Sequence, residues 1–89
     1  MSTIVNDIEV IKAKHTKIND VDFDNLKFGH VFSDHMLECD YKDGKWHTPK
    51  VVPYAPISLD PSAKIFHYGQ SIFEGMKAYK DEQDNVLLF

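Results

Sequence analysis

Hydrophobic and polar positions alternate with the period of a β-strand in several short runs of the chain. Near the N-terminus, residues 8–13 alternate in this way, which is compatible with a strand without deciding it. The polar piece from His15 to Asp24 has the composition of a connector. We therefore expect an N-terminal arm over residues 1–25 and a folded portion over residues 26–89.

The clearest hairpin pattern joins Val31–Tyr41 to Trp46–Tyr54. Its turn, Lys42–Lys45, is centred on an Asp-Gly pair, which tight turns favour because both positions tolerate a positive φ. Proline cannot donate to a strand ladder, so the returning strand is expected to lie at a sheet edge or to be interrupted at Pro49 and Pro53.

A second hairpin is predicted between Gly75–Lys80 and Val86–Phe89, across the polar turn of residues 81–85. The sequence then stops at Phe89, within an apolar run and without a turn, a cap or a polar tail. This pattern is expected for a truncated reading of a longer domain.

Aromatic side chains gather just before the second hairpin. Tyr68, Ile72 and Phe73 fall four and five positions apart, which predicts a short helix over Tyr68–Glu74. Gly75 is expected to end this helix, since glycine readily adopts the left-handed conformation of a helix C-terminus. A backbone that changes type within an aromatic cluster is a usual way to build one wall of a pocket.

Length and composition indicate an ordinary folded chain. With 89 residues there is room for one domain or less, and a chain of this size buries only about 60% of its unfolded surface. A hydrophobic content of 43% with 27% charged residues argues against disorder. The net charge of −4, with no basic face, argues against a nucleic-acid partner.

Location and redox state follow from what the sequence contains. No apolar run approaches the ~20 residues that span a membrane, and the N-terminus has no positive region followed by an apolar stretch. Cys39 is the single cysteine, so no internal disulfide can form, which fits a reducing compartment. We expect a cytoplasmic protein with no membrane partner.

Three ordered motifs resemble one enzyme family. The piece H-Y-G-Q-S-I-F-E-G-M-K-A-Y, within Ile65–Lys80, is similar to the signature segment of branched-chain amino acid aminotransferases. The piece F-G-H-V-F-S-D-H-M-L over Phe28–Leu37 and the piece V-P-Y-A-P-I-S-L-D-P-S-A over Val52–Ala63 match the same family in order and spacing. The resemblance covers about Leu26–Phe89.

The resemblance implies a fold and an activity. Members of this family are pyridoxal 5'-phosphate enzymes of fold type IV. The implied fold class is α/β (α+β), a D-amino-acid-aminotransferase-like small domain with mostly antiparallel hairpins and a short helix, incomplete in this chain. The implied reaction is reversible amino transfer between leucine, isoleucine or valine and 2-oxoglutarate. Homodimers are implied as well, because family members pair their small domains near the sites.

The resemblance also implies a set of substrate-binding residues. The positions that match Phe28, Tyr68 and Phe73 line the pocket for the apolar side chain of the substrate, and the glycine that matches Gly75 lies against the substrate. An apolar wall of this kind suits the chemistry, because aromatic rings give a dry, rigid surface with few torsions. From the residues alone, core packing of Phe28 remains an equal alternative.

No catalytic, cofactor-binding or metal-binding residue is expected in this chain. The family's Schiff-base lysine and its phosphate-binding arginine match no residue here, since both come later in family members. Lys77 is predicted to be a solvated strand lysine, and His30 and His35 lack the spacing of a metal site. By itself the chain is expected neither to hold pyridoxal phosphate covalently nor to transaminate.

Two alternatives stay open. Within the same fold the chain resembles, less closely, a D-amino acid aminotransferase or an aminodeoxychorismate lyase, which lack the motif over Phe28–Leu37. From a different class, the chain would be a binding or interaction module if it ends at Phe89, with an apolar patch around that residue. The module predicts a cooperatively unfolding species of this length. Preference among the three branched amino acids cannot be read from these residues.

Overall fold

The computed structural model describes residues 2–89 and divides into two units, Met1–Ile57 and Ser58–Phe89, called here the N-terminal and C-terminal units. The N-terminal unit is built on a four-stranded sheet of order β1-β2-β6-β3. Its strands are β1 (Ser2–Val5), β2 (Ile8–Ile11), β6 (Lys50–Pro53) and β3 (His35–Glu38).

The alternation over residues 8–13, which is compatible with a strand, corresponds to β2, which ends at Ile11 and pairs with a strand that the sequence pattern did not predict. Strands β1 and β2 form an antiparallel hairpin whose two turn residues, Asn6 and Asp7, have φ values of 50° and 64°. Two positive φ angles define the turn type that matches strand twist. Because β2 also pairs with β6 in parallel, with Glu9 opposite Lys50, the hairpin of residues 2–11 belongs to the sheet.

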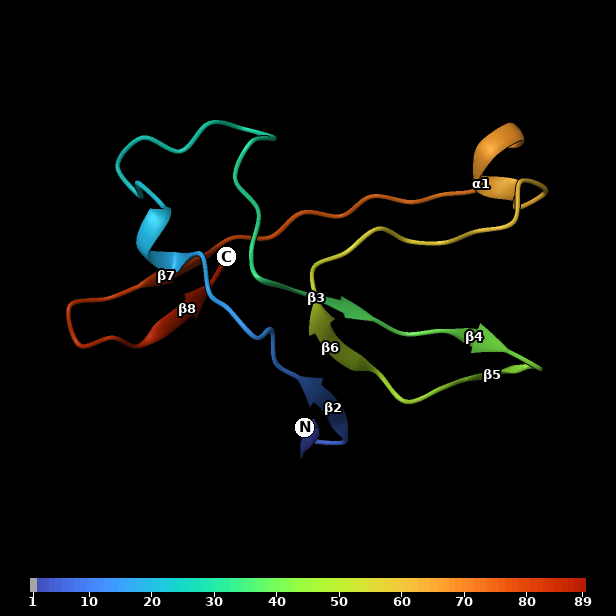
Figure 1. Ribbon diagram of the computed structural model, residues 1–89, viewed down its shortest axis with the longest axis horizontal. Helices are drawn as coiled ribbons and strands as arrows, with labels where there is room; N and C mark the ends of the chain where they lie inside the picture. The colour runs from blue at the N-terminus through green and yellow to red at the C-terminus, as the bar shows by residue number, and fades with distance from the viewer. Residues whose placement is uncertain (1) are drawn as a thin grey trace. The chain divides into compact units, whose positions relative to one another are not determined.

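The first predicted hairpin is confirmed, as is its turn. Strand β3 runs antiparallel to β6, and the hairpin continues into the two-stranded pair β4 (Tyr41–Lys42) and β5 (Lys45–Trp46) (Figure 1). At the turn, Asp43 and Gly44 have φ values of 55° and 77°. The rings of Tyr41 and Trp46 meet edge to face, 5.1 Å apart, and stabilise this narrow end.

The returning strand is interrupted between Trp46 and Lys50, as one of the two alternatives predicted. It does not lie at an edge, because β6 sits between β2 and β3. Pro49 is tolerated directly before this central strand because its position requires only a hydrogen-bond acceptor. Its carbonyl accepts a hydrogen bond from the N–H of Glu9 at 3.0 Å. The outgoing strand begins at His35 and not at Val31, since the preceding residues belong to a loop.

The C-terminal unit contains α1 (Lys64–His67), β7 (Ala78–Lys80) and β8 (Val86–Leu88). Strands β7 and β8 confirm the second predicted hairpin, although β7 starts three residues after Gly75. Asp81 shapes the turn, since its Oδ1 accepts the N–H groups of Gln83 and Asn85, each at 2.8 Å. These side-chain bonds add to the backbone bond that the N–H of Asp81 donates to the carbonyl of Asn85 at 3.0 Å.

The helix predicted over Tyr68–Glu74 is wrong. The helix α1 ends at His67, and residues 68–77 form neither helix nor strand. Gly69, with a φ of 59°, takes the left-handed conformation directly after the C-cap residue Tyr68 and ends the helix. The N–H of Gln70 donates to the carbonyl of Lys64 at 3.1 Å. The glycine signal was therefore valid, but Gly69 carries it in place of Gly75.

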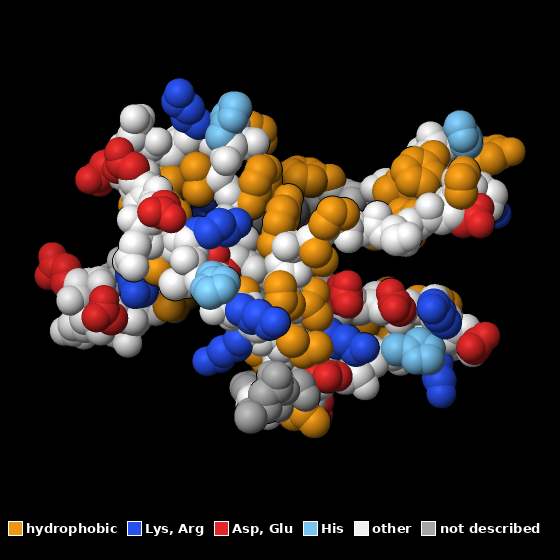
Figure 2. Space-filling view, in the orientation of Figure 1, with side chains coloured by type: hydrophobic (Ala, Val, Ile, Leu, Met, Phe, Trp, Pro, Cys, Tyr) orange, Lys and Arg blue, Asp and Glu red, His pale blue; other side chains and the backbone are white. Residues whose placement is uncertain are grey.

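Side chains of the described residues form no buried core. No described residue is buried, and large hydrophobic side chains stand at the surface in both units (Figure 2). The content of short strands and two short helical turns is compatible with the α+β class.

Candidate functional site

Phe28 lies at the tip of a loop in the N-terminal unit. The loop contains η1 (Ile18–Asp20) and a turn closed by the N–H of His30, which donates to the carbonyl of Lys27 at 3.2 Å. Gly29, with a φ of 77°, provides the positive angle that the third residue of a type II turn needs. Phe28 occupies the second position, and its side chain is fully exposed. Core packing of Phe28 within this unit is therefore not observed.

The other three predicted site residues lie in the C-terminal unit, on one stretch without regular structure. Tyr68 caps the end of α1, while Phe73 and Gly75 follow in the irregular residues 68–77. Tyr68 is 76% exposed and Phe73 is 90% exposed, so neither packs into a core. A Cβ built on Gly75 would lie 3.9 Å from Cζ of Phe73, so the structure brings these two residues together.

The residues described here do not fit a pyridoxal phosphate site. Lys77 is exposed, and its backbone pairs with Phe89 through two hydrogen bonds of 2.9 and 2.7 Å at the start of the β7–β8 hairpin. The sequence has no arginine, and α1 has only four residues, too few to present an N-terminal phosphate cradle.

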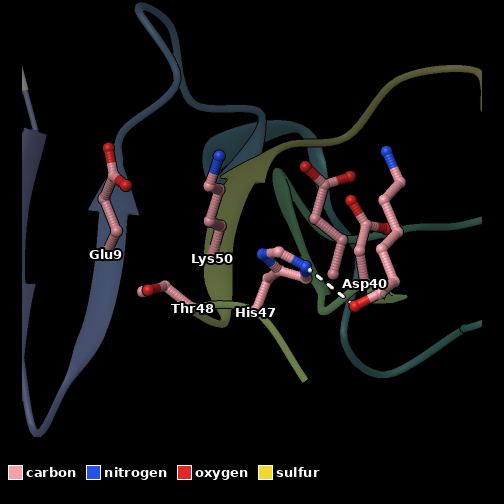
Figure 3. Close-up of a pocket in the computed structure, with 7 residues that line it drawn as sticks. Glu9, Asp40, His47, Thr48 and Lys50 are labelled. Carbon is pink, nitrogen blue, oxygen red and sulfur yellow. Dashed lines mark hydrogen bonds between the residues drawn. The ribbon is translucent and has the colours of Figure 1, made fainter. Parts of the chain in front are cut away.

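A charged hollow lies on the N-terminal unit and contains none of the predicted site residues. Its lining side chains, drawn in Figure 3, come from β2, from the segment of β3 and β4, and from the segment that runs from β5 into β6. Its only internal side-chain bond joins Nε2 of His47 to the carbonyl oxygen of Lys42 at 3.2 Å. The lining residues are Glu9, Glu38, Asp40, Lys42, His47, Thr48 and Lys50. Such a surface is unsuited to an aliphatic side chain.

Asp34 and His35, at the start of β3, make structural contacts with residues far back in the sequence. The carboxylate of Asp34 accepts the hydroxyl of Thr16 at 2.6 Å and the N–H of Lys17 at 3.0 Å. Nε2 of His35 accepts the N–H of Ala13 at 2.9 Å. The sequence pattern missed that these bonds reach back 17 to 22 positions. The one feature of the sequence that could have indicated these bonds is the polar pair Asp34-His35 at the start of a strand, in a chain that also contains a polar connector in need of hydrogen-bond partners.

Hydrogen bonds lower the pKa of three aspartates. The hydroxyl of Thr16 and then the N–H of Lys17 hold the pKa of the Asp34 carboxyl below its usual value. The hydroxyl and N–H of Ser62 do the same to the pKa of Asp60, as do the N–H and amide of Asn85 to the pKa of Asp81. Hydrogen bonds donated to a carboxylate favour its ionised form, which lowers its pKa.

Within residues 2–89 no group of histidine, cysteine and acidic side chains is arranged to hold a metal ion. The same residues include no helix long and apolar enough to cross a membrane.

Comparison with known proteins assigns the chain to a class. It is 49% identical over 80 residues to "Branched-chain-amino-acid aminotransferase 2" of Bacillus subtilis, a match that covers 89% of this chain and 22% of the relative. It is 53% identical over 66 residues to "Branched-chain-amino-acid transaminase 1" of the same organism, covering 73% of this chain and 18% of the relative. A similar match, 50% over 66 residues, is found in Mycolicibacterium smegmatis. No family model matches the chain.

These similarities define the chain as a relative of the aminotransferases. More narrowly, it is a relative of the branched-chain-amino-acid aminotransferases, which confirms the resemblance of the three motifs. The chain spans about a fifth of the length of the curated relatives that it matches.

Proposed function

We propose that this chain is the part of a branched-chain-amino-acid transaminase that forms the wall of its substrate pocket. The observation that carries the proposal is the identity of about 50% over most of the chain to several proteins of that name. The enzyme moves an amino group reversibly between leucine, isoleucine or valine and 2-oxoglutarate. It has the D-amino-acid-aminotransferase-like fold and acts as a homodimer.

Phe28, Tyr68 and Phe73 are proposed to contact the aliphatic side chain of the substrate, with Gly75 against the substrate backbone. Their exposure supports this role, because aromatic rings that no residue of their own unit covers are available to a ligand. They exclude water from the branched side chain, and each methyl group so buried favours the correct substrate over a shorter one. Gly75 leaves room beside Phe73, where any larger residue would project a Cβ.

The cofactor is proposed to be pyridoxal phosphate, which supplies an electron sink for amino transfer. Its lysine and phosphate ligands are assigned to polypeptide outside these 89 residues, in keeping with the poor fit of Lys77. The exposed large hydrophobic side chains of each unit support this assignment, since they are available for packing against further polypeptide.

The test is the activity of the complete protein whose coding sequence contains this chain. Purified with pyridoxal phosphate, it should transfer the amino group of leucine, isoleucine and valine to 2-oxoglutarate much faster than that of alanine. Its sequence should contain an arginine soon after Phe89 and a lysine much later, in a strand. Absence of transfer from all three branched amino acids would overturn the proposal.

A second candidate, a non-catalytic interaction module, is favoured by one observation. Phe89 is 75% exposed, and its ring meets the half-exposed ring of Tyr79 edge to face, with 5.6 Å between centroids, an apolar surface suited to a partner. Urea unfolding of the 89-residue chain separates the two. A cooperative transition with a steep denaturant dependence supports the module, and a broad, non-cooperative loss of structure supports the transaminase.

A further inference from the structure

The two ends of the loop that carries Phe28 meet at one carboxylate. Oδ2 of Asp34 accepts the hydroxyl of Thr16 at 2.6 Å, and Oδ1 accepts the N–H of Lys17 at 3.0 Å. Thr16 also accepts the N–H of Ile18 at 3.1 Å through the same hydroxyl oxygen. These bonds close a loop of residues 17–33 at its base, and we call them the Asp34 clasp.

The clasp is anchored on the central strand of the sheet. The main-chain carbonyl of Asp34 accepts the N–H of Tyr54, the residue after β6, at 2.9 Å. The ring of Tyr54 stacks on Phe32 with 5.5 Å between centroids and 15° between planes, and Nζ of Lys17 lies 5.7 Å from the Tyr54 centroid. Both ends of the loop therefore contact one aromatic ring.

His35 fixes the segment that leads into the loop. Its Nε2 accepts the N–H of Ala13 at 2.9 Å, which requires that this nitrogen carry no proton. The two neighbours, Asp34 and His35, thus bind the connector at Ala13, Thr16 and Lys17. Three bonds from one dipeptide hold a connector that has no regular structure of its own before η1.

Closing the base of a loop restricts its tip. The hydrogen bonds of the clasp offset the conformational entropy that is lost when the loop ends come together. Ligand binding then does not have to offset it. Phe28 stands on a type II turn within this closed loop, with its side chain free of the unit's other residues. A rigid aromatic group contacts a ligand at a lower entropic cost than one on an open loop.

We propose that Asp34 and His35 are positioning residues that close the loop of residues 17–33 and thereby fix Phe28 against the aliphatic side chain of the substrate. Neither residue touches the substrate. The proposal deepens the proposed function and rests on it for the identity of the ligand, whereas the closing of the loop is independent of it.

The test replaces Thr16 in the complete protein. Thr16→Val removes the hydroxyl at nearly constant volume, and Thr16→Ser keeps the hydroxyl as the matched control. For Thr16→Val, amide hydrogen exchange over residues 18–33 should accelerate, while exchange in β2 and β6 stays as in the parent. The ratio of kcat/KM for leucine to that for alanine should fall by about tenfold, chiefly through a higher KM for leucine. Thr16→Ser should keep both values near those of the parent.

Each outcome decides one part of the proposal. If Thr16→Val and Thr16→Ser show the same exchange, the clasp does not close the loop and the proposal is overturned. If the loop loosens while the leucine-to-alanine ratio is unchanged, the positioning of Phe28 is overturned. If the parent protein transfers no amino group from any branched amino acid, the proposed function fails, and the exchange comparison still decides whether the clasp exists.

Discussion

The two units of the chain hold their candidate site residues by different means. In the N-terminal unit, Phe28 stands on a loop whose base is bound by side chains that lie far apart in the sequence. In the C-terminal unit, side-chain hydrogen bonds join residues only two to four positions apart, around Asp60 and Asp81. Residues 68–77, which carry the other three candidates, contain no helix or strand.

This difference indicates that the two parts of the proposed pocket wall obtain their conformation from different sources. A segment with few contacts of its own takes the shape that neighbouring polypeptide imposes, because nothing else offsets its conformational entropy. Phe73, with 90% of its surface exposed, has no packing partner that would fix its rotamer within its own unit. We therefore expect residues 68–77 to acquire their order from the complete protein, and the N-terminal sheet to need it less.

The largest expected effect concerns hydrogen exchange, compared between the 89-residue chain and the complete protein. Amides of residues 68–77 should gain protection by at least about tenfold in the complete protein, because packing supplies the order that the segment lacks. Amides of β2 and β6 should gain the least, since their ladder bonds already exist. Equal gains in both regions would remove the distinction between the units.

A pair of glycine substitutions sharpens the comparison at the level of the backbone. Gly44→Ala should lower the free energy of unfolding by about 1–2 kcal/mol, because Gly44 has a φ of 77°. Gly75→Ala should change stability by less than about 0.5 kcal/mol, since the new Cβ would meet only Cζ of Phe73 at an ordinary 3.9 Å. Urea unfolding of the complete protein measures both. Comparable losses would mean that Gly75 is also held by its backbone.

Several of these features were accessible from the sequence. Alternation and an Asp-Gly pair predicted the first hairpin, and the polar run before Val86 predicted the second. The helix was predicted in the wrong place because the spacing of Tyr68, Ile72 and Phe73 favours a helix after Tyr68. Gly69 instead takes a left-handed conformation and ends the helix before that segment. Strand β1 was missed because Asn6 and Asp7 form its turn without a glycine, which weakens the signal.

The candidate site was predicted to a different extent. Motif resemblance led to the family, which the relatives confirm, and to four residues whose roles remain proposals. Neither alternation nor spacing indicated that Asp34 binds Thr16 and Lys17, because such contacts depend on tertiary placement of a connector without periodicity. The extent of side-chain exposure was equally hidden, since it depends on what packs against each unit.

A smaller effect is expected from pH at the Asp34 clasp. Hydrogen bonds from Thr16 and Lys17 lower the pKa of Asp34 in the folded chain. Its stabilising contribution is therefore complete above the unfolded value of about 3.9 and is lost as pH falls through the lower folded value. The amide shift of Lys17, followed by NMR in this range, should report the loss. If the Lys17 amide shift changes with pH in Asp34→Asn as it does in the parent, the change belongs to a group other than Asp34.

The smallest effect is expected at Lys77. In the 89-residue chain mixed with pyridoxal phosphate, no visible-absorbing adduct should survive dialysis, and Lys77→Ala should leave the spectrum unchanged. Lys77 is exposed and lies one residue before β7, where its backbone pairs with that of Phe89. A dialysis-resistant yellow species that disappears in Lys77→Ala would contradict this expectation.

The most direct test of the pocket wall is the leucine preference of two phenylalanine variants in the complete protein. Phe73→Ala removes a proposed wall residue, and Phe66→Ala removes an exposed ring on α1 that lies outside the proposed wall. Phe73→Ala should lower the ratio of kcat/KM for leucine to that for alanine by about 10- to 100-fold, and Phe66→Ala should keep the parental ratio. An unchanged ratio in Phe73→Ala, or an equal fall in both variants, would contradict the account.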